Sequence, residues 1–127
     1  LYDHPANLFV ATFIGSPEMN VLAGTITADG FAADGVTLPL PKGITASGQA
    51  SYGIRPEHLM LAEDGLPAQV ILVEPMGSET QVTLTLGQHS ITAVFRERII
   101  AAPGETIHLR PDLSKVHLFD ATGMRIG

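Results

Sequence analysis

The chain has 127 residues, a length typical of one domain with its own hydrophobic core. Hydrophobic residues make up 45% of it, but no apolar run approaches the roughly 18 residues of a membrane-spanning helix, so we expect a soluble protein. Thirteen acidic residues against seven Lys and Arg give a net charge of −6, which argues against nucleic-acid binding. The absence of cysteine fits a reducing compartment.

The first residues predict the one clear helix. Asp3 or His4 is a suitable cap, Pro5 is tolerated at the first helical position, and Gly15 ends the segment. A helix of about ten residues is marginal alone in water, so we expect residues 1–15 to pack against the rest. No signal-peptide pattern is visible. Because the sequence opens without Met and Leu1-Tyr2-Asp3 leads at once into a capped helix, we expect a fragment of a longer protein.

From residue 16 onward the pattern predicts short strands separated by turns. Residues 80–86 alternate apolar and polar side chains, as a half-buried strand does, and Gly87-Gln88 predicts a tight hairpin turn. Thirteen glycines and nine prolines among many short segments favour a barrel or a sandwich. The expected strands are, in chain order, Met19–Thr27, Gly30–Leu40, Gln49–Ile54, Leu59–Ala62, Ala68–Glu74, Gln81–Leu86, Ser90–Phe95, Thr106–Arg110 and Val116–Phe119.

The motifs of catalysis and cofactor binding are missing from the sequence. No phosphate-binding loop of the form Gly-x-x-x-x-Gly-Lys-Ser/Thr occurs, so the backbone nest and lysine that hold nucleotide phosphates are absent. The five histidines are dispersed and no cysteine joins them, which disfavours a zinc site, and no serine sits in a nucleophile elbow. We therefore expect no catalytic residue, no cofactor site and no metal site.

The segment Gly53–His58 carries the most specific local signal. Pro56 confines Arg55 to an extended conformation, whereas Gly53 permits a close approach by a neighbour or a positive φ. Such a rigid segment places a planar guanidinium well for pairing with a carboxylate. Glu57 is the nearest candidate partner. The alternatives are Glu74 and Asp120.

Two interpretations of this segment remain open. Arg55 either fixes the chain where a strand leaves the fold, or Arg55 or Glu57 faces another domain or subunit. A similar corner follows the apolar strand at residues 70–73, where Pro75 and Gly77 bend the backbone and Met76 offers an adaptable contact. The candidate structural and interface residues are Gly53, Arg55, Pro56, Glu57, Glu74, Met76, Gly77 and Glu79.

Four short motifs extend, in order, over nearly the whole chain. Their residues are Tyr2, Pro5, Asn7, Phe9, Val10, Ala11, Phe13, Ile14, Gly15, Pro17, Met19 and Asn20; then Gly53, Arg55, Pro56 and Glu57; then Glu74, Gly77 and Glu79; and finally Leu118, Phe119, Asp120, Thr122 and Gly123. In this order they resemble the C-terminal TOBE or regulatory domain of ATP-binding subunits of sugar-type ABC importers, the maltose and glycerol-phosphate importer family. The last motif departs from that pattern by one residue fewer before the threonine.

The resemblance implies a mostly β fold, an OB-like (MOP/TOBE-type) barrel of short antiparallel strands at residues 16–127 behind a leading helix at residues 1–15. It implies one TOBE/OB-like regulatory domain over residues 1–127, with the ATPase domain absent from this chain. ATP and Mg²⁺ would belong to that missing domain, so the fragment itself is not expected to be an enzyme.

The same resemblance implies an accessory, regulatory and dimerisation role in a subunit that couples ATP hydrolysis to import of sugars or related solutes. The implied partners are a second copy in a weak homodimer, the missing nucleotide-binding domain, the importer membrane subunits and a regulatory protein, with no nucleic acid. The implied location is cytoplasmic, at the inner face of the cell membrane.

A stand-alone barrel that binds a small oxyanion is the alternative, because molybdate-binding domains share a related fold. Such a site needs backbone amides together with Ser and Lys side chains. The chain offers only Lys42, Ser47 and Ser51 for this role, and Lys42 and Ser47 are expected in loops.

Overall fold

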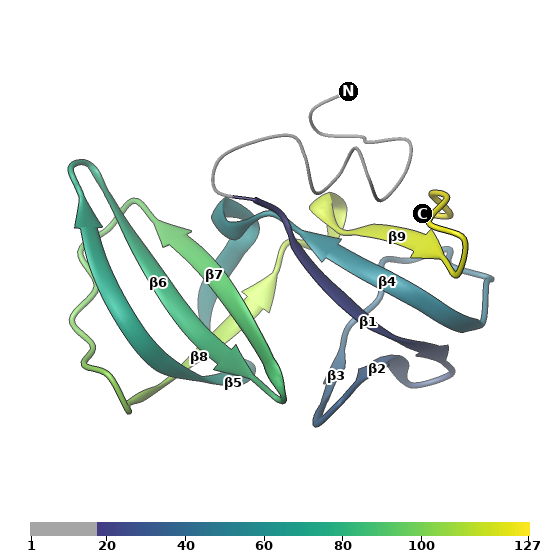
Figure 1. Ribbon diagram of the computed structural model, residues 1–127, viewed down its shortest axis with the longest axis horizontal. Coiled ribbons are helices and arrows are strands. Elements are labelled where there is room, and N and C mark those ends of the chain that lie inside the picture. The colour runs from purple at the N-terminus through teal and green to yellow at the C-terminus, as the bar shows by residue number, and fades with distance from the viewer. Residues whose placement is uncertain (1–17) are drawn as a thin grey trace.

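The computed structural model describes residues 18–127, so the predicted helix at residues 1–15 lies outside the described residues. The described residues form nine strands and two single-turn 3₁₀ helices, arranged as two sheets side by side (Figure 1). In chain order the elements are β1 (Asn20–Thr27), β2 (Gly30–Ala33), β3 (Val36–Leu38), β4 (Gly48–Ile54), η1 (Pro56–His58), β5 (Leu59–Met76), β6 (Glu79–Leu86), β7 (His89–Phe95), β8 (Thr106–Pro111), η2 (Leu113–Lys115) and β9 (His117–Asp120).

The five-stranded sheet has the order β3-β2-β1-β4-β9, and every neighbouring pair is antiparallel. β4 pairs along most of β1, from Asn20 opposite Ile54 to Ile26 opposite Gly48. β9 comes from the far end of the chain and adds to the other side of β4. This sheet therefore joins the first and the last described strands.

The four-stranded sheet has the order β7-β6-β5-β8, again with antiparallel neighbours. β5 is 18 residues long, and its register shifts between Leu61 and Leu66 and again between Val70 and Leu72. Such irregularities bend and twist a strand. The first part of β5 pairs with β8 alone, and its last part pairs with β6.

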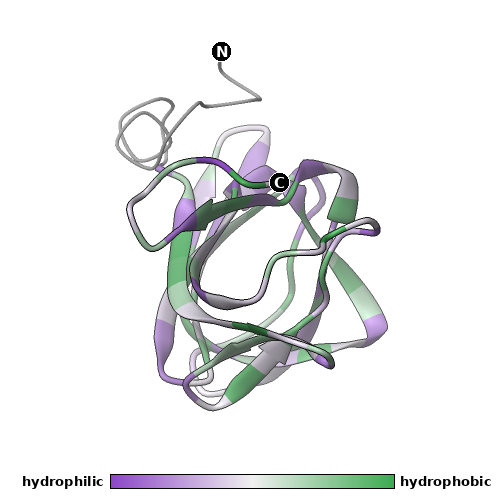
Figure 2. Cartoon of the chain, turned by 90° about the vertical axis from the view of Figure 1, so that its right-hand side faces the viewer, coloured by the Kyte–Doolittle hydropathy of each residue, from purple (hydrophilic) through white to green (hydrophobic). Residues whose placement is uncertain are grey.

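The two sheets share one hydrophobic core. In β6, Val82, Leu84 and Leu86 are buried while the residues between them are only partly buried, the period of two expected of a strand with one covered face. The same cluster of buried side chains includes Leu22 and Tyr52 of the other sheet. Apolar and polar positions alternate along the curved strands in the turned view (Figure 2).

Tyr52 fixes the loop that follows β3. Its hydroxyl donates a hydrogen bond to the carbonyl of Pro39 at 2.7 Å, and its ring centroid lies 5.2 Å from that of Phe31. Burial raises the pKa of Tyr52, so the phenol remains a neutral donor. The loop is thereby held against the five-stranded sheet.

The prediction of a mostly β fold is confirmed, and most expected strands lie within a few residues of the observed ones. Two expectations were wrong in detail. Gly30–Leu40 forms two strands, β2 and β3, because Asp34-Gly35 turns the chain, with Gly35 at a φ of 85°. Leu59–Ala62 and Ala68–Glu74 belong to one strand, β5, because β8 continues as partner across the irregular stretch between them.

The closed barrel expected from the resemblance is also corrected. Within residues 18–127, the hydrogen-bonded ladders divide into two sheets and do not form a closed ring. Packing of apolar faces joins the sheets instead. The grouping of residues 1–127 as a single domain stays a prediction.

Candidate functional site

The corner after β4 is built around a buried arginine. Arg55 follows β4 directly in an extended conformation (φ −73°, ψ 147°), and the buried Pro56 opens η1 behind it. The Arg55 side chain is 1% exposed. Its Nε donates to Oε2 of Glu57 at 3.2 Å, which is the pairing expected from the sequence. The Glu57 side chain remains 38% exposed, so the pair reaches from the interior to the surface.

Gly53 serves this corner by being small. A β-carbon built at Gly53 would lie 2.7 Å from Sδ of Met19 and 3.4 Å from the Phe119 ring. Both neighbours are buried. The sequence suggested two reasons for glycine at position 53, a close approach by a neighbour or a positive φ. The close approach is the one that applies.

The corner after β5 is exposed and is shaped by backbone conformation. Met76 lies opposite Glu79 at the end of the β5–β6 ladder, so Gly77 and Ser78 form a two-residue turn. Gly77 has a φ of 76°, and nothing lies within 4 Å of a β-carbon built there. The Met76 side chain is 57% exposed. The turn offers apolar surface to solvent.

The two corners meet at one groove, with Glu57 from the first and Glu79 from the second on its wall. The groove has a volume of about 490 Å³ and lies between η1, the start of β5 and the end of β7. We call it the acidic groove, and its lining residues are Glu57, Leu59, Met60, Leu61, Glu79, Val94, Phe95, Arg96 and Glu97. It brings together two candidate residues that are far apart in the sequence.

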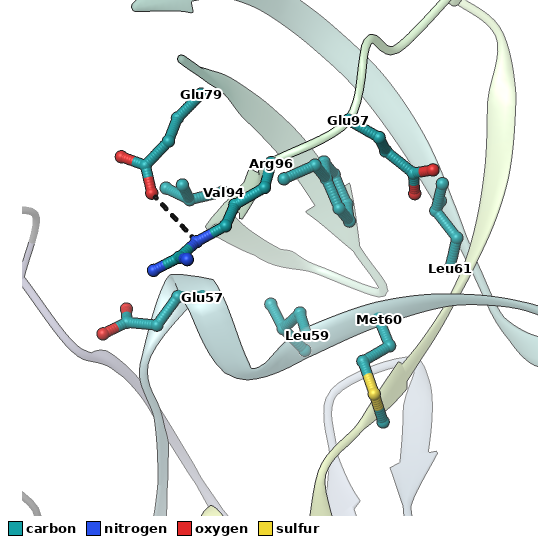
Figure 3. A pocket seen from close by; sticks show the side chains of 9 residues that line it. Glu57, Leu59, Met60, Leu61, Glu79, Val94, Arg96 and Glu97 are labelled. Carbon is teal, nitrogen blue, oxygen red and sulfur yellow. Dashed lines mark ion pairs between the residues drawn. The ribbon is translucent and has the colours of Figure 1, made fainter.

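Three carboxylates and one guanidinium line the acidic groove. Arg96 reaches between Glu79 and Glu57, and Glu97 lies on the far side beside Leu61 (Figure 3). The Arg96 Nε is 3.9 Å from Oε2 of Glu79, and the Arg96 side chain is 91% exposed. At that distance and exposure the ion pair is worth little, because water screens it. Glu57 is also paired with the buried Arg55 at 3.2 Å, so the walls of the groove keep only a small net negative charge.

The apolar part of the groove comes from β5 and β7. Leu59 and Phe95 are buried, with exposed fractions of 4% and 5%, whereas Met60 and Leu61 are 40% and 41% exposed. Exposed apolar side chains beside a hollow are typical of a contact surface rather than of a folded core.

The edge of β7 borders the same groove. Among the described residues β7 has a single neighbouring strand, β6. The side-chain amide of Asn20 occupies part of the free edge, because its Nδ2 donates to the Thr92 carbonyl and its Oδ1 accepts from the Thr92 amide, both at 2.8 Å. The backbone groups of Thr92 therefore point away from β6.

The remaining candidate residues do not line this groove. Glu74 lies opposite Gln81 in the β5–β6 ladder, and Pro75 and Gly77 border a neighbouring hollow of about 560 Å³. Asp120 accepts from the Thr122 hydroxyl and from the amides of Thr122 and Met124, so its carboxylate closes its own turn. Those hydrogen bonds lower the pKa of Asp120.

Sequence reasoning did not identify Arg96, Glu97 and Val94 as site residues. The sequence signal that could have identified them is the charged pair Arg96-Glu97 directly after an apolar strand. Charged residues often follow strands, so this signal is weak. No group of three or more metal-ligating side chains is found within residues 18–127, and none of the helices described there is long and apolar enough to cross a membrane.

The family model of the TOBE domain matches residues 52–119, which is more than half of the chain, and that of the MalK OB fold domain matches residues 15–59. The chain belongs to the TOBE domain family. The second match covers β1 to η1 and the first covers the remaining strands through β9 apart from its last residue.

Relatives of this TOBE domain include ABC transporter proteins. An uncharacterised ABC transporter ATP-binding protein of Sinorhizobium fredii is 51% identical over 133 residues, covering 99% of this chain and 36% of that protein. The sn-glycerol-3-phosphate import ATP-binding protein UgpC of Yersinia pestis is 37% identical over 134 residues, covering 99% and 38%. The chain thus spans little more than a third of the length of these relatives.

A solved structure with a similar fold is the cytoplasmic molybdate-binding protein ModG with molybdate bound. It aligns with a TM-score of 0.64 and 19% identity, over 84% of this chain and 97% of that one. At that identity the likeness concerns the fold.

Proposed function

We propose that this chain is the C-terminal accessory and regulatory domain of the ATP-binding subunit of an ABC importer for sugars or related solutes. The observation that carries the proposal is the joint match to the TOBE and MalK OB models with relatives named as ABC transporter ATP-binding proteins. The parent subunit would bind ATP and Mg²⁺ in another domain and would work at the inner face of the cell membrane. This chain would need no cofactor.

Within that subunit the domain would supply contacts rather than chemistry. Its partners would be a second copy, the nucleotide-binding domain, the importer membrane subunits and a regulatory protein. An interface between two copies would use the same patch on both. The exposed corner at Pro75–Glu79, with Met76 at its tip, is the surface that suits it. The chain alone would pair weakly, because stable interfaces usually bury about 1,200–2,000 Å² in total.

Two measurements on the 127-residue chain test this proposal. Sedimentation at rising protein concentration is expected to reveal weak self-association, whereas ATP titration and phosphate release are expected to give no signal. A strictly monomeric chain at high concentration contradicts the dimerisation role. Measurable ATP turnover contradicts the accessory role altogether.

A stand-alone oxyanion binder is the second candidate, favoured by the fold likeness to the molybdate-binding protein. Lys42 and Ser47 are exposed, and neither lines the hollow beside β4 that contains Ser51. That hollow also contains Asp120, whose charge repels an anion. Molybdate titration followed by calorimetry distinguishes the two candidates, since saturable heat supports the oxyanion binder and its absence supports the accessory domain.

A further inference from the structure

Within residues 18–127 the edge of β7 opposite β6 pairs with no strand, and it continues past Asn20, beside η1, into the acidic groove. Thr92 directs its backbone amide and carbonyl away from β6, because both bond to the Asn20 side chain. Along an antiparallel strand this direction alternates, so Val94, two residues on, also turns its backbone groups away from β6. Val94 lines the groove. The groove thus has a row of apolar side chains, a strand edge and acidic walls.

We propose that the acidic groove binds an extended segment of a protein partner in which apolar residues alternate with Arg or Lys. The segment would add one short strand to the edge of β7 at Val94, its cations would lie near Glu57, Glu79 and Glu97, and its apolar side chains would cover Leu61 and Met60. Strand addition of this kind combines backbone hydrogen bonds with pockets for alternate side chains. The inference names the chemistry of a partner for the proposed accessory domain and rests on that proposal only for the domain's role as a contact surface.

Charge decides between a basic segment and the other occupants. A second copy related by a two-fold axis would bring the same lining of three carboxylates and one guanidinium to both sides, so carboxylates would outnumber cations across the contact. Like charges brought together across an interface cost free energy, so the acidic groove does not suit self-association. The groove carboxylates would repel an acidic segment for the same reason.

Arg96 of this chain shows that a guanidinium fits between the carboxylates of the groove (Figure 3). Its guanidinium lies between Glu79 and Glu57 on a side chain that is 91% exposed, with Nε 3.9 Å from Oε2 of Glu79. Because this contact is long and solvated, an incoming guanidinium displaces it at little cost. Arg96 is therefore a competitor for the groove, and removing its charge strengthens the binding of a cationic segment.

The occupant is short. Asn20 already bonds Thr92 and η1 packs against β7, so the part of the edge that lines the groove runs from Val94 to the end of β7 at Phe95 and the following Arg96. This length suits about three residues of an extended chain at roughly 3.3 Å per residue.

The direct test uses a fluorescein-labelled octapeptide that alternates leucine with arginine, titrated with the 127-residue chain and followed by fluorescence anisotropy. Saturable binding is expected, together with loss of binding when glutamate replaces arginine or serine replaces leucine. Absence of saturable binding, or equal binding of the serine–arginine peptide, overturns the proposal, because the second result leaves only unspecific charge attraction.

The acidic walls are tested by paired substitutions. Glu79→Gln with Glu97→Gln is expected to weaken binding about tenfold, since an exposed ion pair contributes a factor of about two to five. The matched control, Asp29→Asn with Glu105→Gln, removes two exposed charges elsewhere and should change binding less than twofold. Arg96→Gln should tighten binding about two- to fivefold. Equal weakening by the control pair, or weaker binding after Arg96→Gln, contradicts the assignment of the groove.

Strand addition is tested on both partners. Val94→Pro removes one outward N–H, a change tolerated at a free strand edge, and should weaken binding at least tenfold, while Val94→Thr should retain it. Peptides N-methylated only at leucines or only at arginines give a second measurement that leaves the protein unchanged. Alternate amides of a strand face the same edge, so one of the two peptides should lose binding and the other keep it. Equal affinity of both overturns the added strand.

Self-association of the same variants separates this inference from the proposed function. If Glu97→Gln, at a position in the groove but outside the Pro75–Glu79 corner, strengthens pairing of the chain with itself, a second copy occupies the groove and the inference fails while the dimer survives. If peptide binding behaves as expected in a monomeric chain, the inference holds and the dimer fails.

Discussion

The two corners of this domain resemble each other in sequence and differ in physics. The corner at Gly53–Glu57 encloses a side chain that is 1% exposed, and its glycine is required because buried neighbours leave no room for a β-carbon. The corner at Pro75–Glu79 carries a methionine that is 57% exposed, and its glycine is required by a φ of 76° in open space. Glycine and proline punctuation therefore marks a turn but does not tell whether the turn is structural or available to a partner.

The largest effect is expected from the buried corner. Arg55→Ala should lower the free energy of unfolding by about 1–3 kcal/mol, because it removes a buried, hydrogen-bonded side chain and leaves Glu57 without this partner. Urea unfolding measures the loss. The control is Arg110→Ala, whose guanidinium is 54% exposed and lies 3.4 Å from Asp64, with an expected loss below about 1 kcal/mol. Equal losses would mean that burial does not distinguish the two arginines.

Alanine substitutions test why each corner contains glycine, at Gly53 because of close packing and at Gly77 because of a positive φ. Gly53→Ala should cost about 1–3 kcal/mol by overpacking against Met19, and Gly77→Ala about 1–2 kcal/mol by backbone strain. Thermal melts of both variants provide the comparison.

Second substitutions identify the cause in each case. Met19→Ala makes room, so Gly53→Ala should cost less in that background than alone. Gly77→Asn should cost less than Gly77→Ala, because asparagine tolerates a positive φ. If Met19→Ala leaves the cost of Gly53→Ala unchanged, close packing at that glycine is not the reason for its presence.

Acid should destabilise the domain through two aspartates that close short turns. Hydrogen bonds from Ser114 and Thr122 lower the pKa values of Asp112 and Asp120 below their ordinary 3.8. Because the folded state favours the charged form, their contribution is present above about pH 4 and is lost as the pH falls through the lowered values. Melting temperatures measured from about pH 6 to pH 2 should fall less steeply in Asp112→Asn and Asp120→Asn. If the melting temperatures of wild type and variants fall equally with pH, neither carboxylate causes the loss of stability in acid.

The smallest effect on stability is expected at the exposed corner. Met76→Ser should change the free energy of unfolding by less than about 0.5 kcal/mol, because the side chain is already mostly in water. It should nevertheless weaken self-association in sedimentation runs. Met124→Ser alters a methionine that is 54% exposed at the other end of the chain and should leave association unchanged. If both variants self-associate equally strongly, the self-association surface does not include Met76.

The sequence by itself determined the class of fold and most strand positions. Local patterns were enough to predict features that depend on neighbouring residues alone. Examples are the alternation at residues 80–86, the turn at Gly87-Gln88 and the extended conformation that Pro56 imposes on Arg55. Glu57, the nearest of the candidate carboxylates, is a partner of Arg55, whereas Glu74 and Asp120 lie elsewhere.

Only the tertiary structure decided which segments meet. β9 joins β4 across more than sixty residues, and β5 continues through an irregular stretch because β8 pairs on both sides of it. The acidic groove exists because the sheet curls until the end of β7 lies near η1, which brings Glu57 and Glu79 together with Arg96. Burial depends on the whole packing arrangement rather than on nearest neighbours in sequence, and this is why similar corners became an interior anchor and an exposed turn.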